Sequence, residues 1–395
     1  MIKTYQELLD EAAADLANNN SQEISAADVR NLCVNIIDTM FHMAVDESGS
    51  RQEGTDTIAT GLSSHAEGSG SVASGNFSHA EGIHTTADGS GSHCEGYYSR
   101  ASGAYSHAEA SAFAYGEQSH AENTGRAYGM GSHAEGFNTI ASGHGSHAEG
   151  YVCHALGFAS HAEGGGSTFG TKAYGNYSHS EGFETIASGI ASHAEGQSTL
   201  SRGAASHAEG TSTIASGISS HAEGNFTVAS GDCSHAGGSL SCARFHGQYA
   251  HGAANNTQPG AMQYSRYYLY GTTDGIGTNK ELYIGGESIR LAIDDGCTMM
   301  FNAMVVGRDT TTGESIGIRV VGVIKNVDGT VSLIDSPIIQ DIWIDGSFPG
   351  YVFTVSADDT NKSLKFAAEN SGGNQIAWHA VVEANELNTI LLTVV

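Results

Sequence analysis

The stretch SHAEGFNTIASGHGSHAEG, residues 132–150, decides the fold. SHAEG occurs in it twice, and it returns at 64–68, 78–82, 160–164, 192–196, 206–210 and 220–224. Histidines in this context stand at 65, 79, 93, 107, 120, 133, 147, 161, 179, 193, 207, 221 and 235. Most intervals between them are 14 residues, two are 13, and one is 18 because of an insertion near 165–168. Regular repetition outranks other signals, because each repeat forms one structural unit.

The repeated unit, S-H-A-E-G-x-x-T-x-A-S-G-x-x, contains two short runs that each end at a glycine. Glycine supplies positive φ at tight corners, and two glycines per 14 residues would be costly in a helix. No proline occurs before residue 259, as an uninterrupted hydrogen-bond ladder prefers. The pattern therefore predicts a β-solenoid in which each repeat is one turn and neighbouring turns stack about 4.8 Å apart.

The inward positions of such a turn carry mostly Ala, Ser and Thr. Small side chains bury too little apolar area to offset about 1.5 kcal/mol of ordering entropy per residue. We therefore expect neighbouring chains to supply the missing burial, which makes the protein an obligate homo-oligomer.

The thirteen in-phase copies of this unit resemble the head repeat of trimeric autotransporter adhesins, which ends in S-V-A-x-G. In the present sequence, His and Glu replace the two aliphatic residues of that pattern. The resemblance implies a homotrimeric, left-handed parallel β-roll. Arrays of SHAEG are also similar to those of bacteriophage tail and fibre proteins. The segments QYAHGA (248–253), MQYSRYYLYG (262–271), ESIGIRVVGVIKN (314–326), VSADDTNKSLKF (355–366) and QIAWHAVVEA (375–384) resemble a C-terminal β-sandwich of phage tail fibres.

The chain is thus predicted to be mostly β, with four parts. Residues 1–46 carry two amphipathic helical patterns and form an attachment or oligomerisation module. Residues 47–58 are a linker, 59–242 are the SHAEG-repeat shaft, and 243–395 are the C-terminal sandwich. In the last part, strands are predicted at 299–306, 316–324, 330–334, 351–355, 363–366 and 376–382.

Histidine and glutamate two residues apart on a strand share one face, so stacked turns align them in columns. The predicted structural ladder comprises His65, Glu67, His79, Glu81, His93, Glu95, His107, Glu109, His133, Glu135, His147, Glu149, His161, Glu163, His193, Glu195, His207, Glu209, His221 and Glu223. We expect hydrogen-bonded His–Glu pairs at the roll interior or a chain–chain interface. A pH-sensitive ladder and a metal site are the alternatives. Because the pair recurs twelve times, a catalytic role is not expected, and no cofactor or metal is predicted.

Aromatic residues at variable corners are candidates for receptor contact. These candidates are Tyr97, Tyr105, Phe137, Tyr151 and Phe183, together with Trp343 and Trp378 of the C-terminal part. Buried packing is the common role of tryptophan, so both tryptophans are also expected in the sandwich core.

Charge and composition exclude several classes. A net charge of −27 argues against nucleic-acid binding, which requires cationic side chains. No 18-residue apolar run predicts membrane insertion, and no secretion signal is visible. The six cysteines show no paired spacing, which favours assembly in a reducing compartment.

Together these features predict a non-enzymatic bacteriophage fibre, assembled in the host cytoplasm and carried on the virion. Its N-terminus is expected to bind other virion proteins, and its C-terminal part a host cell-surface glycan or protein. Three alternatives stay open. The first is a fibre with a self-cleaving C-terminal chaperone domain, for which His246, His251, Asn255 and Asn256 are candidates. The others are a bacterial surface adhesin and a glycan depolymerase.

Overall fold

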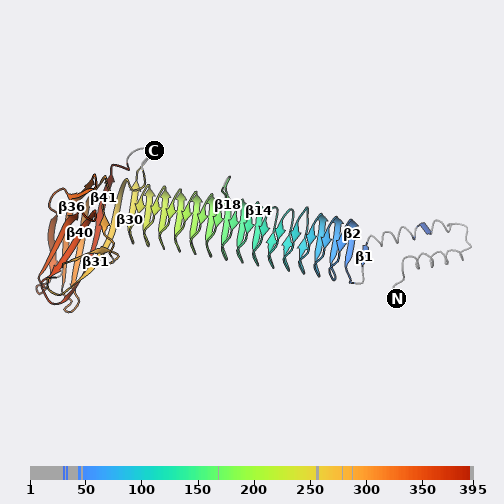
Figure 1. Cartoon of the computed structure of the whole chain (residues 1–395), viewed down its shortest axis with the longest axis horizontal. Helices are drawn as coiled ribbons and strands as arrows, with labels where there is room; N and C mark the ends of the chain where they lie inside the picture. Colours follow the sequence, from blue (N-terminus) through green and yellow to red (C-terminus); the bar gives the residue numbers. More distant parts are fainter. Residues whose placement is uncertain are drawn as a thin grey trace, which may run out of the picture. The chain divides into compact units, whose positions relative to one another are not determined.

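The computed structural model describes residues 30, 31, 33, 43–45, 48–167, 169–254, 258–277, 279–286 and 288–391. The chain divides into two compact units, Met1–Ala159 and Ser160–Val395. Both units contain turns of a parallel β-solenoid, about 14 in all, and the second also contains C-terminal antiparallel sheets (Figure 1).

The helical module predicted for residues 1–46 lies almost wholly outside the described residues. Arg30, Asn31 and Cys33 are helical. Strand β1 (Met43–Val45) falls where the second helix was predicted to end, and it pairs antiparallel with β2 (Arg51–Thr55). An apolar periodicity alone could not mark this change from helix to strand.

In the first unit, each solenoid turn contributes one strand to each of two parallel sheets. One sheet contains β2 and seven further strands, β4 (His65–Ser69), β6 (His79–Ile83), β8 (His93–Cys94), β10 (His107–Ala108), β12 (His120–Ala121), β14 (His133–Phe137) and β16 (His147–Tyr151). The other contains β3 (Ile58–Ala59), β5 (Val72–Ala73), β7 (Thr86–Ala87), β9 (Arg100–Ala101), β11 (Phe113–Ala114), β13 (Arg126–Ala127), β15 (Ile140–Ala141) and β17 (His154–Ala155). Equivalent repeat positions pair, as His133 with His147 and Glu135 with Glu149.

The interior of each turn is built from small side chains, as predicted. In the turn that begins at His133, Ser132, Ala134, Thr139 and Ala141 are at most 1% exposed. The serine hydroxyl also closes the corner, because Ser132 Oγ donates to the carbonyl oxygen of Gly129 at 2.7 Å. Ile140, which follows the buried threonine, is only half-buried. The larger aliphatic side chains therefore lie outside the turn.

The corner glycine four residues before each histidine has a different role from the one predicted. Gly143 is not at positive φ; instead, a Cβ added to it would lie 1.8 Å from the carbonyl oxygen of Gly157 in the next turn. Corner residues at positive φ are often not glycine, such as Asn138 (φ 54°) and Tyr105 (φ 56°). The corner glycine is therefore required by the close approach of successive turns, and the left-handed corners tolerate ordinary side chains.

The glycine after the glutamate accompanies the longer strands, although β8 is short with Gly96 at φ 94°. Gly136 has φ 103° and lies in the five-residue strand β14. In the two 13-residue turns this position holds Ala110 and Asn123, and strands β10 and β12 shrink to two residues. A residue with a Cβ cannot easily adopt φ near 100°, so the chain leaves the sheet early at these turns.

The second unit begins with the same architecture. Its first sheet contains β18 (His161–Gly165), β20 (His179–Phe183), β22 (His193–Gln197), β24 (His207–Thr211), β26 (His221–Asn225), β28 (His235–Ser239) and β30 (Tyr249–Ala253). Its second contains β19 (Lys172–Ala173), β21 (Ile186–Ala187), β23 (Leu200–Ser201), β25 (Ile214–Ala215), β27 (Val228–Ala229) and β29 (Cys242–Ala243). The spacing of 18 residues is absorbed between β18 and β19, and His161 still pairs with His179.

The C-terminal part of this unit is antiparallel. Its larger sheet comprises β31 (Met262–Asp274), β33 (Tyr283–Ile284), β35 (Cys297–Asp309), β36 (Ser315–Val327), β37 (Thr330–Leu333), β38 (Ile338–Ile344) and β41 (Gln375–Asn388). Its smaller sheet comprises β32 (Asn279–Glu281), β34 (Leu291–Ala292), β39 (Tyr351–Asp358) and β40 (Ser363–Asn370). Side chains of both sheets share one hydrophobic core, which includes Phe301, Phe366 and Trp378. The six predicted strands all coincide with observed strands, whereas β31 and β38 were not predicted as strands.

The last solenoid turn is closed by the first long antiparallel strand. Strand β30 pairs parallel with β28 on one side and antiparallel with β31 on the other. At β29, Gln263 takes the place of a further strand, because its amide accepts from Cys242 N at 2.8 Å and donates to Cys242 O at 3.0 Å. The side chain of Gln263 is 8% exposed.

The predicted boundaries are too narrow by about one turn at each end. Residues 51–59, mostly assigned to a linker, form β2 and β3, and Glu53 pairs with Glu67 in the register of the repeat. Residues 249–253, assigned to the sandwich, form β30. Arg51 and Tyr249 stand where other turns have histidine, so a search keyed to histidine misses both turns. Within the described residues, no helix is long and apolar enough to span a membrane.

Candidate functional site

The predicted histidine columns exist in both units, and their rings stack face to face. In the first unit, the ring centroids of His65 and His79 are 4.7 Å apart, with 2° between their planes. In the second, those of His193 and His207 are also 4.7 Å apart. Stacking ends at His235, whose ring is turned by 74° relative to that of His221. The expected 4.8 Å spacing follows from the parallel register of the turns.

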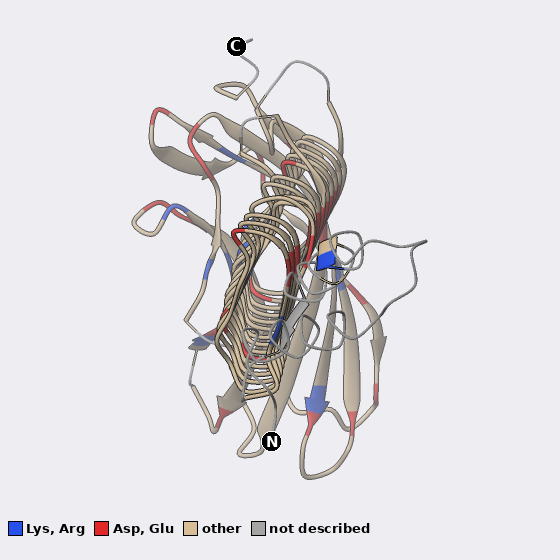
Figure 2. Cartoon of the chain, turned by 90° about the vertical axis from the view of Figure 1, so that its right-hand side faces the viewer, with Lys and Arg blue, Asp and Glu red and all other residues tan. Residues whose placement is uncertain are grey.

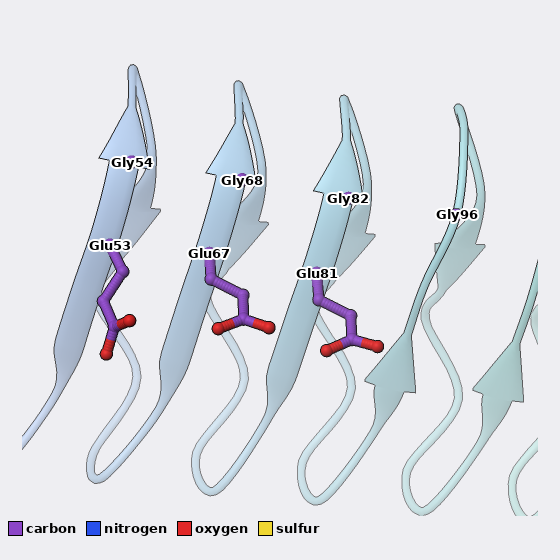
Figure 3. Close-up of a pocket in the computed structure, with 7 residues that line it drawn as sticks. All are labelled: Glu53, Gly54, Glu67, Gly68, Glu81, Gly82 and Gly96. Atoms are coloured by element: carbon purple, nitrogen blue, oxygen red, sulfur yellow. The ribbon is translucent and has the colours of Figure 1, made fainter.

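The glutamates two residues later form a column beside the histidines. Figure 3 shows the side chains of Glu53, Glu67 and Glu81 leaving β2, β4 and β6 on the same face, beside the glycines that follow them. Viewed along the turns, the acidic residues of successive turns line up (Figure 2).

Most histidine Nε2 atoms face a carboxylate oxygen of their own turn, of the preceding turn, or of both. His65 Nε2 lies 3.6 Å from Glu53 Oε1 and 3.7 Å from Glu67 Oε2. His193 Nε2 lies 3.9 Å from both Glu181 and Glu195. Two pairs of the second unit come within hydrogen-bond distance, namely His221–Glu209 and His235–Glu223, both at 3.2 Å. Most of these His–Glu distances are thus longer than the predicted hydrogen bonds.

The columns lie on the outer face of the turns, so their placement at the roll interior is wrong. The side chains of His133 and Glu135 are 34% and 38% exposed, whereas Ala134 between them is fully buried. The interior has no room for imidazole, because opposing small residues fill it. The alternative prediction, a chain–chain interface, stays a prediction.

The columns perturb the protonation of their own members. Partial burial lowers the pKa of the His79, His93, His120, His193 and His207 imidazoles, and neighbouring imidazoles lower it further. Hydrogen bonds to the carboxyls of Glu67 and Glu95 raise the pKa of Glu81 to about 7. The bond with Glu81 in turn lowers the pKa of Glu95. Neighbouring carboxyls therefore share protons.

These shifts act on stability in opposite directions. A lowered histidine pKa contributes stability that is present above the unfolded value of 6.5 and is lost as the pH falls below it. The raised pKa of Glu81 contributes stability that is present below 4.5 and is lost as the pH rises through about 7.

The candidate corner aromatics are exposed. Tyr97, Tyr105, Phe137, Tyr151 and Phe183 have between 45% and 67% of their surface accessible. Two of them stack on each other across successive turns; the rings of Phe137 and Tyr151 are 5.2 Å apart and 8° from parallel. Tyr115 and Tyr128, which stack at 5.1 Å, were not among the candidates, although they occupy equivalent positions of successive turns.

The two tryptophans have opposite environments. Trp378 is 1% exposed in the core and its Nε1 donates to Thr273 Oγ1, so its proposed receptor contact is wrong. Trp343 is 75% exposed, so its predicted core position is wrong. It lies on β38, which the sequence analysis missed and in which every residue is exposed. Ile338, Ile342 and Ile344 of this strand are also exposed.

The candidates for self-cleavage are only partly described. Asn255 and Asn256 lie outside the described residues. His246 lines a pocket with Asp232, Arg244 and Ile284 at the end of the solenoid in the second unit. His251 is on β30, and its Nδ1 would lie 3.4 Å from a Cβ added to Gly237.

Comparisons with known proteins do not show a family for this chain. No family model matches the chain, and no curated protein matches it. A solved structure that matches is a tailspike protein of the Acinetobacter baumannii bacteriophage Fri1, described as a capsular polysaccharide depolymerase. It shares 9% identity, the match covers 87% of this chain and 72% of that one, and the TM-score is 0.24. A likeness at this level carries no argument about function.

Proposed function

We propose that the chain is the structural subunit of a bacteriophage tail appendage that works as a homotrimer. Its N-terminal residues attach it to other virion proteins, its solenoid turns act as a spacer, and its C-terminal sheets bind a host surface glycan or protein. The observation that carries the proposal is the in-register SHAEG solenoid whose last strand, β30, joins an antiparallel sheet directly. A repeating spacer joined to a terminal sheet domain suits a mechanical and adhesive role.

Two features support association with further copies. The solenoid turns bury almost only Ala, Ser and Thr, which leaves them short of apolar contact. The C-terminal sheet also leaves apolar side chains accessible; Met300, Met304 and Val306 alternate along one face of β35 and are 47–55% exposed. Contiguous exposed apolar surface of this kind is typical of protein interfaces.

Sedimentation equilibrium of the full-length chain tests the oligomer. We expect a species of three times the 40.8 kDa chain mass, at concentrations where a weak complex would dissociate. A well-folded monomer in dilute buffer would contradict the proposal. Mass spectrometry of the same sample separates an intact chain from the self-cleaving alternative, which would give two fragments.

Immunogold electron microscopy tests the appendage role. Antibodies against residues 1–29 and against the C-terminal sheets should label purified particles, the first close to the particle and the second away from it. Particles that carry neither label would refute the role. A Trp343→Ala variant tests receptor binding, because Trp343 is exposed and its loss should weaken adsorption while leaving the fold intact.

A further inference from the structure

We propose that the His–Glu columns form a linear array of binding sites for divalent transition-metal ions such as Zn²⁺ or Ni²⁺. Each ion is bound by the Nε2 atom of one histidine and by one carboxylate oxygen from each of two adjacent turns. This proposal does not depend on the proposed function.

The arrangement of donors repeats in both units. His133 Nε2 lies 3.6 Å from Glu122 Oε1 and 3.6 Å from Glu135 Oε2. His179 Nε2 lies 3.8 Å from Glu163 Oε1 and 3.8 Å from Glu181 Oε2. Each of these two ring nitrogens is therefore equally distant from carboxylate oxygens of two adjacent turns. The Nε2 atoms of His65, His133 and His179 are buried and make no hydrogen bond.

The distances fit an ion between the donors better than a direct bond. A hydrogen bond between a ring nitrogen and a carboxylate oxygen spans about 2.7–3.2 Å. A tetrahedral ion with ligands at about 2.0–2.2 Å holds its nitrogen and oxygen ligands roughly 3.3–3.5 Å apart. The donors around His133 need to move inward by only a few tenths of an ångström to reach that geometry.

The solenoid spacing decides how many histidines one ion can take. The rings of His120 and His133 are 4.7 Å apart and nearly parallel. Two nitrogen ligands of one ion can be separated by about 4.2 Å at most, since each bond is about 2.1 Å long. One ion therefore takes one histidine and two carboxylates, and water completes the coordination. A mixed nitrogen and oxygen set of this kind suits Zn²⁺ and Ni²⁺, whereas Mg²⁺ and Ca²⁺ prefer oxygen alone.

Charge balance predicts how many ions one chain binds. Two carboxylates balance one divalent ion, but each glutamate lies between the histidines of two turns, as Glu181 lies near His179 and His193. Ions in every turn would stand about 4.8 Å apart and repel one another strongly. Filling alternate turns uses each carboxylate once and leaves no excess charge. The thirteen histidines of the column therefore predict about six ions per chain.

The column changes at its last histidine. At His235 the glutamate of the same turn is replaced by Gly237, and His235 Nε2 lies 3.2 Å from Glu223 Oε1. His251 pairs with Gly237 in the next turn, and a Cβ added to Gly237 would lie 3.3 Å from His235 Nε2 and 3.4 Å from His251 Nδ1. This turn therefore lacks the second carboxylate of the proposed site and has an imidazole nearby in its place. The ring of His235 is also rotated out of the stack.

The test is equilibrium dialysis of the untagged full-length chain against Zn²⁺ or Ni²⁺ in excess Mg²⁺, with bound metal measured by mass spectrometry. We expect about six ions per chain, and X-ray absorption should show imidazole and carboxylate ligands at about 2.0–2.1 Å. A Glu122→Gln/Glu135→Gln variant removes both oxygen ligands of His133 and should lose one or two ions. Glu117→Gln, an exposed carboxylate at a corner away from the column, should lose none.

A second variant keeps the test informative if the first does not fold. Glu181→Gln/Glu195→Gln removes both carboxylates that face His193 in the other unit. Circular dichroism checks that each variant keeps its β structure. Fewer than one ion bound per wild-type chain, unchanged binding in the folded double variants, or an absorption spectrum without imidazole would each overturn the proposal.

Discussion

Replacing Gly143 by alanine would place a Cβ 1.8 Å from the carbonyl oxygen of Gly157 in the next turn. Ordinary contacts between carbon and oxygen need more than 3 Å, so the two turns would have to separate by more than an ångström. The affected ladder includes the bonds from Ser142 N to Ala155 O at 2.9 Å and from Gly143 N to Ala155 O at 3.4 Å. Losing two or three such bonds costs about 1–4.5 kcal/mol, since each contributes about 0.5–1.5 kcal/mol.

Gly145→Ala provides a matched control in the same turn. Gly145 has φ 62°, and a Cβ added to it meets no atom within 4 Å. Alanine already occupies the equivalent corner at Ala191 and Ala205, with φ of 52° and 53°. The only expected cost is backbone strain of about 1 kcal/mol.

Thermal unfolding followed by circular dichroism compares the two variants, and hydrogen exchange of peptides that cover 140–160 locates the effect. Gly143→Ala should lower the unfolding temperature more and should speed exchange in both turns that meet at Gly157. If Gly145→Ala were as destabilising as Gly143→Ala, backbone conformation rather than close approach would explain the corner glycines, and our reasoning would be refuted.

Three further perturbations follow from the structure. The raised pKa of Glu81 should cost wild type about 1 kcal/mol of stability, after solvent screening, as the pH rises from 5 to 8. Glu81→Gln should remove this loss, which denaturant titrations at both pH values measure. Trp378→Ala should cost about 3–5 kcal/mol because it empties the core, whereas Trp343→Ala should leave the urea midpoint almost unchanged; equal effects would contradict the assigned burial. Ser132→Ala should cost about 1 kcal/mol in the same assay, because only the hydroxyl bond to Gly129 O is lost; a loss above 3 kcal/mol would mean that the hydroxyl does more than close the corner.

The solenoid could be predicted because its determinants are local and repeated. One histidine in a pentapeptide of small residues gives little information. The regular spacing of thirteen such histidines, however, defines the length of the turn, the register between turns and the histidine column together. The buried Ser, Ala and Thr positions followed from strand alternation. The role of Gly143 could not be predicted, because its contact is with the next turn and not with its own neighbours in sequence.

The wrong predictions concern sequence patterns that are compatible with more than one structure. Strand alternation shows that His133 and Glu135 share a face, but it does not say whether that face points into the turn or out of it. The two tryptophans were treated alike because both lie in strand-like sequence, yet only Trp378 has aromatic neighbours in the core, such as Phe353. Strand β38 lacks alternation, since both of its faces are exposed, and so gave no strand signal.

The covered edges of the parallel ladders have a consequence for assembly. A bare edge strand is a template on which another chain can add, and a stack of identical turns would otherwise polymerise end to end. In the first unit, β1 runs antiparallel over the edge of β2. In the second, β31 covers β30 and the amide of Gln263 occupies the edge at Cys242. The covered strands β2 and β30 then offer no parallel template for filament growth, so end-to-end stacking is hindered at these strands.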